Sequence, residues 1–218
     1  PAAILGQLHS GWQLRIQREL VPGHGVGPSR FGEMLAAMIE QHYPNVRRIR
    51  AWADPAAQYG ADREDGQLAW LEIVGSIIGV PVLVPFGGSN EIAMRIDAVK
   101  AELQTDGTTP NMLISPECKL LTRGFASKYR YKKRKAEAGS DYEDKPEKND
   151  YSHPHDALQY LVGGVRGRQA IVRGGQRRRN ATRDEAGEQA SAWSQGAGMS
   201  RGATGKGGGR GFDPHRIG

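Results

Sequence analysis

Cysteine, aromatic residues and long apolar runs are all scarce in this sequence of 218 residues. The single cysteine, Cys118, excludes an internal disulfide and a zinc cluster built from several thiolates, and is typical of a reducing compartment. The longest apolar run, residues 77–86, is interrupted by Gly and Pro and is far shorter than the roughly 20 apolar residues of a membrane-spanning helix. The composition therefore favours neither a disulfide-stapled nor a membrane-spanning protein.

Charge is distributed unevenly along the chain. Residues 166–218 contain 11 Lys and Arg against 4 Asp and Glu, together with 13 of the 30 glycines. Residues 1–165 contain 19 basic and 20 acidic residues, so the net charge of +6 belongs to the C-terminal part and a uniformly basic globule is excluded. We expect a folded domain over residues 1–165 and a disordered, basic, Gly/Arg-rich tail over residues 166–218.

Hydrophobic periodicity predicts a β-hairpin followed by alternating helices and strands. The hairpin should join residues 2–8 to 12–20, where Leu14 and Ile16 alternate with polar residues. Helices are expected from Ser29 as N-cap, over 67–78 with Gly79 as C-cap, from Ser89 or Asn90 as cap to Leu103, over 116–123 and over 155–162. Strands are expected over 46–53, 80–85, 112–114 and 129–133, and the almost wholly apolar strand 80–85 should be buried on both faces. The charged stretch 132–150 should be a mobile loop. This order predicts an α/β fold with a mixed sheet flanked by helices.

Asp54 is the first candidate for chemistry. It follows a predicted strand, and open α/β sheets bind their ligands at the carboxyl ends of strands. The simpler interpretation is that Asp54-Pro55 is only a turn that ends the strand. Taken alone, this second interpretation is favoured.

The second candidate is the segment 152–158, Ser-His-Pro-His-Asp-Ala-Leu. His153 and Asp156 are three residues apart, so they can face the same side where a loop becomes a helix, and Pro154 suits the first turn. The simpler interpretation makes Ser152 or His153 a helix cap and Asp156 an ordinary first-turn acid.

Together, Asp54 and Asp156 indicate a metal site. Mg²⁺ and Mn²⁺ prefer carboxylate ligands and fill their other positions with water and phosphate oxygens. A nuclease that uses two such ions needs carboxylates from separate elements, because the ions lie about 4 Å apart across the scissile phosphate. His153 would be a third ligand or a proton shuttle.

Several longer segments carry a family resemblance. The most specific is 148–160, Lys-Asn-Asp-Tyr-Ser-His-Pro-His-Asp-Ala-Leu-Gln-Tyr. The others are the initial Pro-Ala-Ala with Gly6-Gln7, the segment 52–56 (Trp-Ala-Asp-Pro-Ala), the segment 90–103 with Arg95-Ile96 and Ala98-Val99, and Ile114-Ser115-Pro116 with Cys118. By these motifs the chain, from Pro1 to about Gly164, resembles the C-terminal nuclease domain of the large terminase subunit of tailed bacteriophages.

The resemblance implies a ribonuclease H-like fold and an endonuclease that cuts concatemeric double-stranded viral DNA with two Mg²⁺ or Mn²⁺ ions. Of the family's three metal-binding acids, Asp54 matches the second and Asp156 the third. His153 matches a histidine that accompanies the third acid in some members. The first acid would lie a few residues before Pro1, so the resemblance implies a fragment with one ligand missing and lowered activity.

The resemblance also implies partners and a location. A packaging ATPase domain that binds ATP would precede this domain in the same polypeptide, since no Gly-Lys-Ser/Thr phosphate loop occurs here. The portal protein and the small terminase subunit would be partners in the host cytoplasm during virion assembly, or in the bacterial cytoplasm for a prophage-encoded protein. No membrane partner is expected.

Six basic residues lie between Lys128 and Lys135, interleaved with two tyrosines. Such a segment can follow a DNA backbone through phosphate contacts, or it can be a solvated strand edge protected by lysines. We interpret the following as DNA contacts: Lys128, Arg130, Lys132, Lys133, Lys145 and Lys148. The tail would bind nucleic acid, a protein partner or neither.

Two alternatives to the terminase nuclease remain open. One is another ribonuclease H-like nuclease of the resolvase or transposase type, against which the segment 148–160 argues. The other is a catalytically inactive DNA-binding module, in which the basic segment and the tail do the binding.

Overall fold

The computed structural model describes residues 1–9, 13–58, 68–104, 110–133 and 142–167, which all belong to one structural unit, Pro1–Gln176. From residue 168 onward, the predicted disordered tail lies outside the described residues. Among the helices described, none is both long and apolar enough to cross a membrane.

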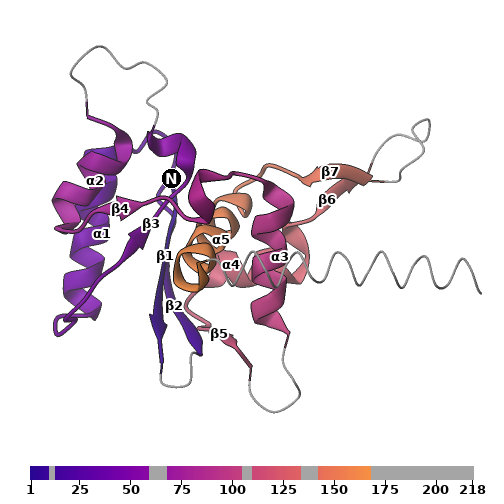
Figure 1. Ribbon diagram of the computed structural model, residues 1–218, viewed down its shortest axis with the longest axis horizontal. Helices are drawn as coiled ribbons and strands as arrows, with labels where there is room; N and C mark the ends of the chain where they lie inside the picture. The colour runs from indigo at the N-terminus through magenta and orange to yellow at the C-terminus, as the bar shows by residue number, and fades with distance from the viewer. Residues whose placement is uncertain (10–12, 59–67, 105–109, 134–141, 168–218) are drawn as a thin grey trace, which may run out of the picture. The chain divides into compact units, whose positions relative to one another are not determined.

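The first sheet is built from the N-terminal hairpin and one later strand (Figure 1). β1 (Ala3–Leu8) pairs antiparallel with β2 (Leu14–Leu20), with a register shift between Leu5 and Gly6. β5 (Met112–Ile114) pairs in parallel with the other edge of β2. Leu14 and Ile16 are each 1% exposed, as the alternation in this strand predicts. The predicted hairpin and the strand at 112–114 are confirmed.

A second sheet joins β3 (Ala51–Trp52) to β4 (Val82–Leu83) in parallel. Both strands are much shorter than the predicted ranges 46–53 and 80–85. The prediction that the second of these is buried on both faces is wrong, because Leu83 is 53% exposed. Apolar composition alone does not bury a strand that has only one partner strand in the described region.

Helices α1 (Pro28–His42) and α2 (Trp70–Ile78) pack against each other beside this second sheet (Figure 1). α2 ends at Gly79, whose φ of 73° is the left-handed conformation of the predicted C-cap. The prediction of Ser29 as an N-cap is wrong. The N-cap of α1 is Gly27, because Pro28 has a φ that already suits the first helical position.

Helices α3 (Ile92–Leu103), α4 (Lys119–Arg123) and α5 (Ser152–Arg166) surround the main hydrophobic core. This main core is formed by ten buried side chains: Leu14, Ile16, Phe86, Ala98, Val99, Met112, Cys118, Leu121, Leu158 and Val162. α5 packs against α3, β1 and β3. An added Cβ at Gly164 would overlap the Trp52 ring, so this glycine permits the close approach of α5 to β3.

α5 is longer than the predicted 155–162, and it contains the boundary expected after residue 165. Arg166, in its last turn, forms a buried ion pair with Glu102 of α3. The short helical turns η1 (Pro55–Gln58), η2 (Phe86–Gly88) and η3 (Gly124–Lys128, a π-helical turn) connect the longer elements.

β6 (Tyr131–Lys133) and β7 (Tyr142–Pro146) form an antiparallel pair that extends away from the helices (Figure 1). The prediction of a loop over 132–150 is therefore wrong for residues 132–133 and 142–146, whereas residues 147–150 do form a loop. Backbone pairing holds the two strands even though their side chains are charged. The described elements together form a mixed α/β fold that contains a mixed sheet, and this confirms the predicted α/β class.

Candidate metal and DNA-binding site

Asp54 lies just beyond the carboxyl end of β3, as the sequence predicts. Its Oδ1 accepts a hydrogen bond from the backbone N–H of Ala56 at 2.9 Å, which begins the turn η1. The same oxygen accepts a second hydrogen bond, at 3.0 Å, from Nδ2 of Asn90. Asp54 therefore ends the strand and also faces a polar partner from a distant segment, so the turn interpretation alone is incomplete.

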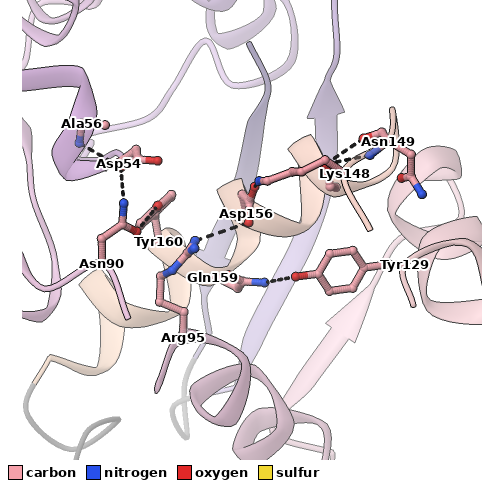
Figure 2. A network of polar contacts seen from close by, with 11 residues as sticks. Asp54, Ala56, Asn90, Arg95, Tyr129, Lys148, Asn149, Asp156, Gln159 and Tyr160 are labelled. Carbon is pink, nitrogen blue, oxygen red and sulfur yellow. Dashed lines mark hydrogen bonds and ion pairs between the residues drawn. The ribbon is translucent and has the colours of Figure 1, made fainter. Parts of the chain in front are cut away.

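Asp156 lies near the start of α5 and has a cationic partner on each carboxylate oxygen (Figure 2). Oδ1 is 3.3 Å from Nη1 of Arg95, and Oδ2 is 2.7 Å from Nζ of Lys148. The Asp156 side chain is 17% exposed, the Arg95 side chain 6% and the Lys148 side chain 70%. One partner is therefore buried and fixed, whereas the other reaches in from solvent.

A chain of polar contacts links the two acids (Figure 2). The hydroxyl of Tyr160 donates to Oδ1 of Asn90 at 2.8 Å, and Asn90 in turn donates to Asp54. The guanidinium of Arg95, which holds Asp156, lies 4.8 Å from the centre of the Tyr160 ring. Burial raises the pKa of Tyr160, so its hydroxyl remains a donor at neutral pH. These three residues therefore fix both carboxylates.

Sequence reasoning assigned no part in the site to Arg95 or Tyr160, and it treated Asn90 only as a possible helix cap. A signal for Arg95 exists, because it lies at helical spacing between Ile92 and Val99 on the apolar face of α3. A charged residue on such a face requires a buried partner. Nothing in the local pattern identifies that partner as Asp156.

The loop before α5 is held in place by Asn149. Its Nδ2 donates to the backbone carbonyl of Lys128, and its own carbonyl accepts from Oγ of Ser152 at 2.7 Å. Its Oδ1 accepts from the backbone N–H of Tyr151. These contacts fix the backbone next to Lys148. The prediction of Ser152 or His153 as the helix cap is wrong, because Tyr151 is the N-cap of α5. The Ser152 hydroxyl instead bonds backward to the loop.

One cavity of about 1350 Å³ brings the predicted site residues together. Asp54, Lys148, His153 and Asp156 all contribute to its lining. The side chain of His153 is exposed at this cavity, whereas its neighbour His155 is buried. The two carboxylates and the histidine that the sequence singles out therefore border a single space.

Two strand edges also border this cavity. Within the described residues, β1 pairs only with β2 and β3 only with β4. Residues 1–8 and 47–54 line the cavity, and side chains of α1, α2 and α5 contribute to its walls. β1 and β3 run in opposite directions (Figure 1). A single extended strand between them would therefore be antiparallel to β1 and parallel to β3.

The donor set fits one divalent ion better than two. Among the described residues, no three His, Cys, Asp or Glu side chains gather closely enough to hold a metal. Mg²⁺ is commonly held by one or two carboxylates, with water and substrate phosphate in the remaining positions. Asp54 and Asp156 match that pattern, whereas a second ion requires at least one further ligand.

The buried histidine beside the site has a different environment. The His155 ring stacks on Tyr129, with centroids 4.3 Å apart, and meets Phe125 edge-on at 4.5 Å. Gly124 leaves room for it, since an added Cβ there would overlap the imidazole. Burial lowers the pKa of His155 to about 4, so it is neutral at pH 7. This residue is part of the packing.

The predicted DNA contacts are exposed and lie on neighbouring elements of the chain. Exposed side chains come from η3, β6, β7 and the loop before α5: Lys128, Arg130, Lys132, Lys133, Lys145 and Lys148. The backbone joins these elements, because the N–H of Glu147 donates to the carbonyl of Arg130. Within the described part of the chain, Lys148 is paired with Asp156, and the other five have no acidic partner there.

Comparisons with known proteins assign this chain to no family. No family model, no curated protein and no solved structure matches the chain. The fold and the site define an α/β protein in which two carboxylates and a histidine border one cavity, beside an exposed basic strand pair. Any function must be argued from these features.

Proposed function

We propose that this chain is the nuclease domain of a large terminase subunit, with a ribonuclease H-like fold, and that it cuts concatemeric double-stranded DNA with Mg²⁺ or Mn²⁺. The observation that carries the proposal is that Asp54, beyond β3, lines the same cavity as His153 and Asp156 of α5, about 100 positions later in the chain. The proposal includes an ATP-binding domain upstream, the portal protein and the small terminase subunit as partners, and action in the host cytoplasm.

Each residue has a distinct part in this proposal. Asp54 and Asp156 would bind the ions through their carboxylate oxygens, oriented by Asn90 and Arg95 respectively. His153, exposed at the same cavity, would carry a proton to or from water. When bound, the ions would activate the attacking water and stabilise the leaving oxygen.

The third acid of the proposed site would come from a strand in the cavity between β1 and β3. Such a strand would join the two sheets into one, and it would run towards the carboxyl end of β3, where Asp54 lies. An acidic residue at its end would therefore face Asp54 and Asp156. The apolar side chains of α1, α2 and α5 that line the cavity would cover its two faces.

The basic surface would hold the DNA backbone. Lys128, Arg130, Lys132, Lys133 and Lys145 are all exposed, and each phosphate that they neutralise would add salt-dependent affinity without base readout. The strand pair β6–β7 leads through the loop at Lys148 directly to Asp156. DNA following this surface would therefore arrive at the acids.

Supercoiled-plasmid cleavage with Mn²⁺ tests the proposal. The chain should be compared with a version extended at its N-terminus by residues of its own gene, since that extension would supply the strand and the first acid. We expect the extended protein to cut, and Asp54→Asn or Asp156→Asn to lower the rate about 100-fold or more.

Glu33→Gln is the matched control. This exposed carboxylate on α1 lies outside the cavity, so its removal should leave cleavage unchanged. An extended protein that binds DNA but never cuts it, with either metal, would contradict the nuclease proposal.

A DNA-binding module without catalysis is the second candidate. The observation that favours it is that both oxygens of Asp156 already have cationic partners, so the carboxylate is neutralised without a metal. In that case Asp54→Asn and Asp156→Asn should leave DNA affinity unchanged or raised, and no variant should cut. Deletion of residues 168–218, which keeps the buried Arg166–Glu102 ion pair of α5, would then show how much of the affinity belongs to the tail.

A further inference from the structure

The two cations at Asp156 differ in how easily each can leave. Arg95 is buried, stacks on Tyr160 and is held within α3, so its removal would leave Oδ1 of a largely buried carboxylate without its charged partner. Lys148 is 70% exposed, and only its flexible side chain reaches the carboxylate from a loop that Asn149 fixes. An ammonium on a four-carbon stem is a strongly hydrated point charge that solvent can accept.

The Lys148 ammonium occupies the position where a divalent ion would bind Asp156. It lies 2.7 Å from Oδ2, and Lys148 and Asp156 line the same cavity as Asp54. A metal ion bound through Oδ2 would compete for the same lone pairs and would repel the ammonium. Arg95 contacts the other oxygen, so it can remain in place.

We propose that Lys148 is an exchangeable counter-ion for the metal site. It neutralises Asp156 when no metal is present and is displaced when a divalent ion binds. The displaced ammonium then stays beside the site on its anchored loop, where a DNA phosphate can accept it. This inference rests on the proposed function, because it requires that Asp156 bind a metal.

The exchange predicts that removal of the lysine charge strengthens metal binding. Mn²⁺ binding to the full chain, measured without DNA by electron paramagnetic resonance or calorimetry, should be about fivefold tighter in Lys148→Gln than in the wild type. Lys148→Arg keeps a cation at this position and should bind Mn²⁺ as the wild type does. Lys119→Gln removes the charge of an exposed lysine on α4 and should also leave Mn²⁺ affinity unchanged.

Asp156→Asn separates failure of the exchange from failure of the metal site. If Asp156→Asn weakens Mn²⁺ binding about tenfold or more while Lys148→Gln leaves it unchanged or weaker, the metal site stands and the exchange is overturned. Equal strengthening by Lys119→Gln would also overturn the exchange, since the effect would be one of net charge. If Asp156→Asn binds Mn²⁺ as the wild type does, the metal site fails, and the exchange fails with it.

Discussion

The two hydrophobic cores of the described region differ in how completely they are enclosed. The main core, between β2, β5 and helices α3 to α5, contains ten buried side chains, and several of them have no exposure to solvent. The second core, between α1, α2 and the β3–β4 sheet, has only three: Leu20, Phe31 and Val74. Its other members are partly buried, as in the case of Trp70, Ile78 and Val82.

The cavity accounts for this difference. Phe31, Trp70, Val74, Ile78 and Val82 belong to the second core and also line the cavity between β1 and β3. A strand placed there would cover these side chains and would give the second core the enclosure that the main core has. The site acids lie where the two regions meet, with Asp54 beyond β3 and Asp156 on α5.

Truncation of a main-core residue should give the largest effect. Leu158 is fully buried in α5, so Leu158→Ala should lower the free energy of unfolding by about 3–5 kcal/mol, measured by urea denaturation. Val74→Ala in the second core should cost only about 1–2 kcal/mol, because its side chain borders an existing cavity. Equal losses in the two variants would contradict the difference between the cores.

Helix α5, which packs on the main core, also contains a buried titratable side chain, His155. The pKa of His155 is lowered by burial to about 4, against 6.5 for an ordinary histidine, although a hydrogen bond to the Leu121 backbone and the nearby Asp156 charge oppose the shift. The unfolded chain therefore binds this proton more readily. Stability should be full above pH 6.5 and fall by about 2–3 kcal/mol as the pH drops towards 4.

His155→Phe supplies the control for this pH dependence. Phenylalanine keeps a ring against Tyr129 and Phe125 but cannot be protonated. The urea midpoint of the variant should change much less between pH 7 and pH 4 than that of the wild type. A slope that persists unchanged in the variant would assign the acid sensitivity to other groups.

Local patterns were sufficient where one segment determines its own structure. The alternation around Leu14 and Ile16 predicted the hairpin, and the apolar run before Gly79 predicted α2 and its C-cap. Predictions failed where contacts with distant parts of the chain determine the structure. Leu83 is exposed because burial depends on neighbouring elements, and β7 forms in a charged stretch because pairing with β6 satisfies its backbone.

The candidate site shows the same limit. Asp54 and Asp156 could be proposed because each follows a local signal, a strand end and a helix start. The contacts that orient them join residues 70 positions apart (Tyr160 and Asn90) and 61 positions apart (Arg95 and Asp156). One sequence contains no local pattern for such pairs. Asn90, predicted as one of two alternative helix caps, instead binds Asp54 and Tyr160, and Glu91 is the N-cap of α3.

The smallest predicted effect concerns Tyr160, which holds Asn90, the residue that reaches Asp54 in the second region. Tyr160→Phe removes the hydroxyl that donates to Asn90 but keeps the ring under Arg95. The loss of one hydrogen bond should lower the free energy of unfolding by about 1 kcal/mol. Because Asn90 also holds Asp54, Mn²⁺ affinity should fall severalfold in the same variant.

Tyr151→Phe is the matched control, because the Tyr151 hydroxyl makes no hydrogen bond to the residues that the structure describes. It should change neither stability nor Mn²⁺ affinity. If Tyr160→Phe loses stability without losing metal affinity, the hydroxyl only holds Asn90. If both fall together, and neither falls in the control, the contact between Tyr160 and Asn90 also sets the position of Asp54. The metal site would then depend on the packing of α5 as well as on the two acids.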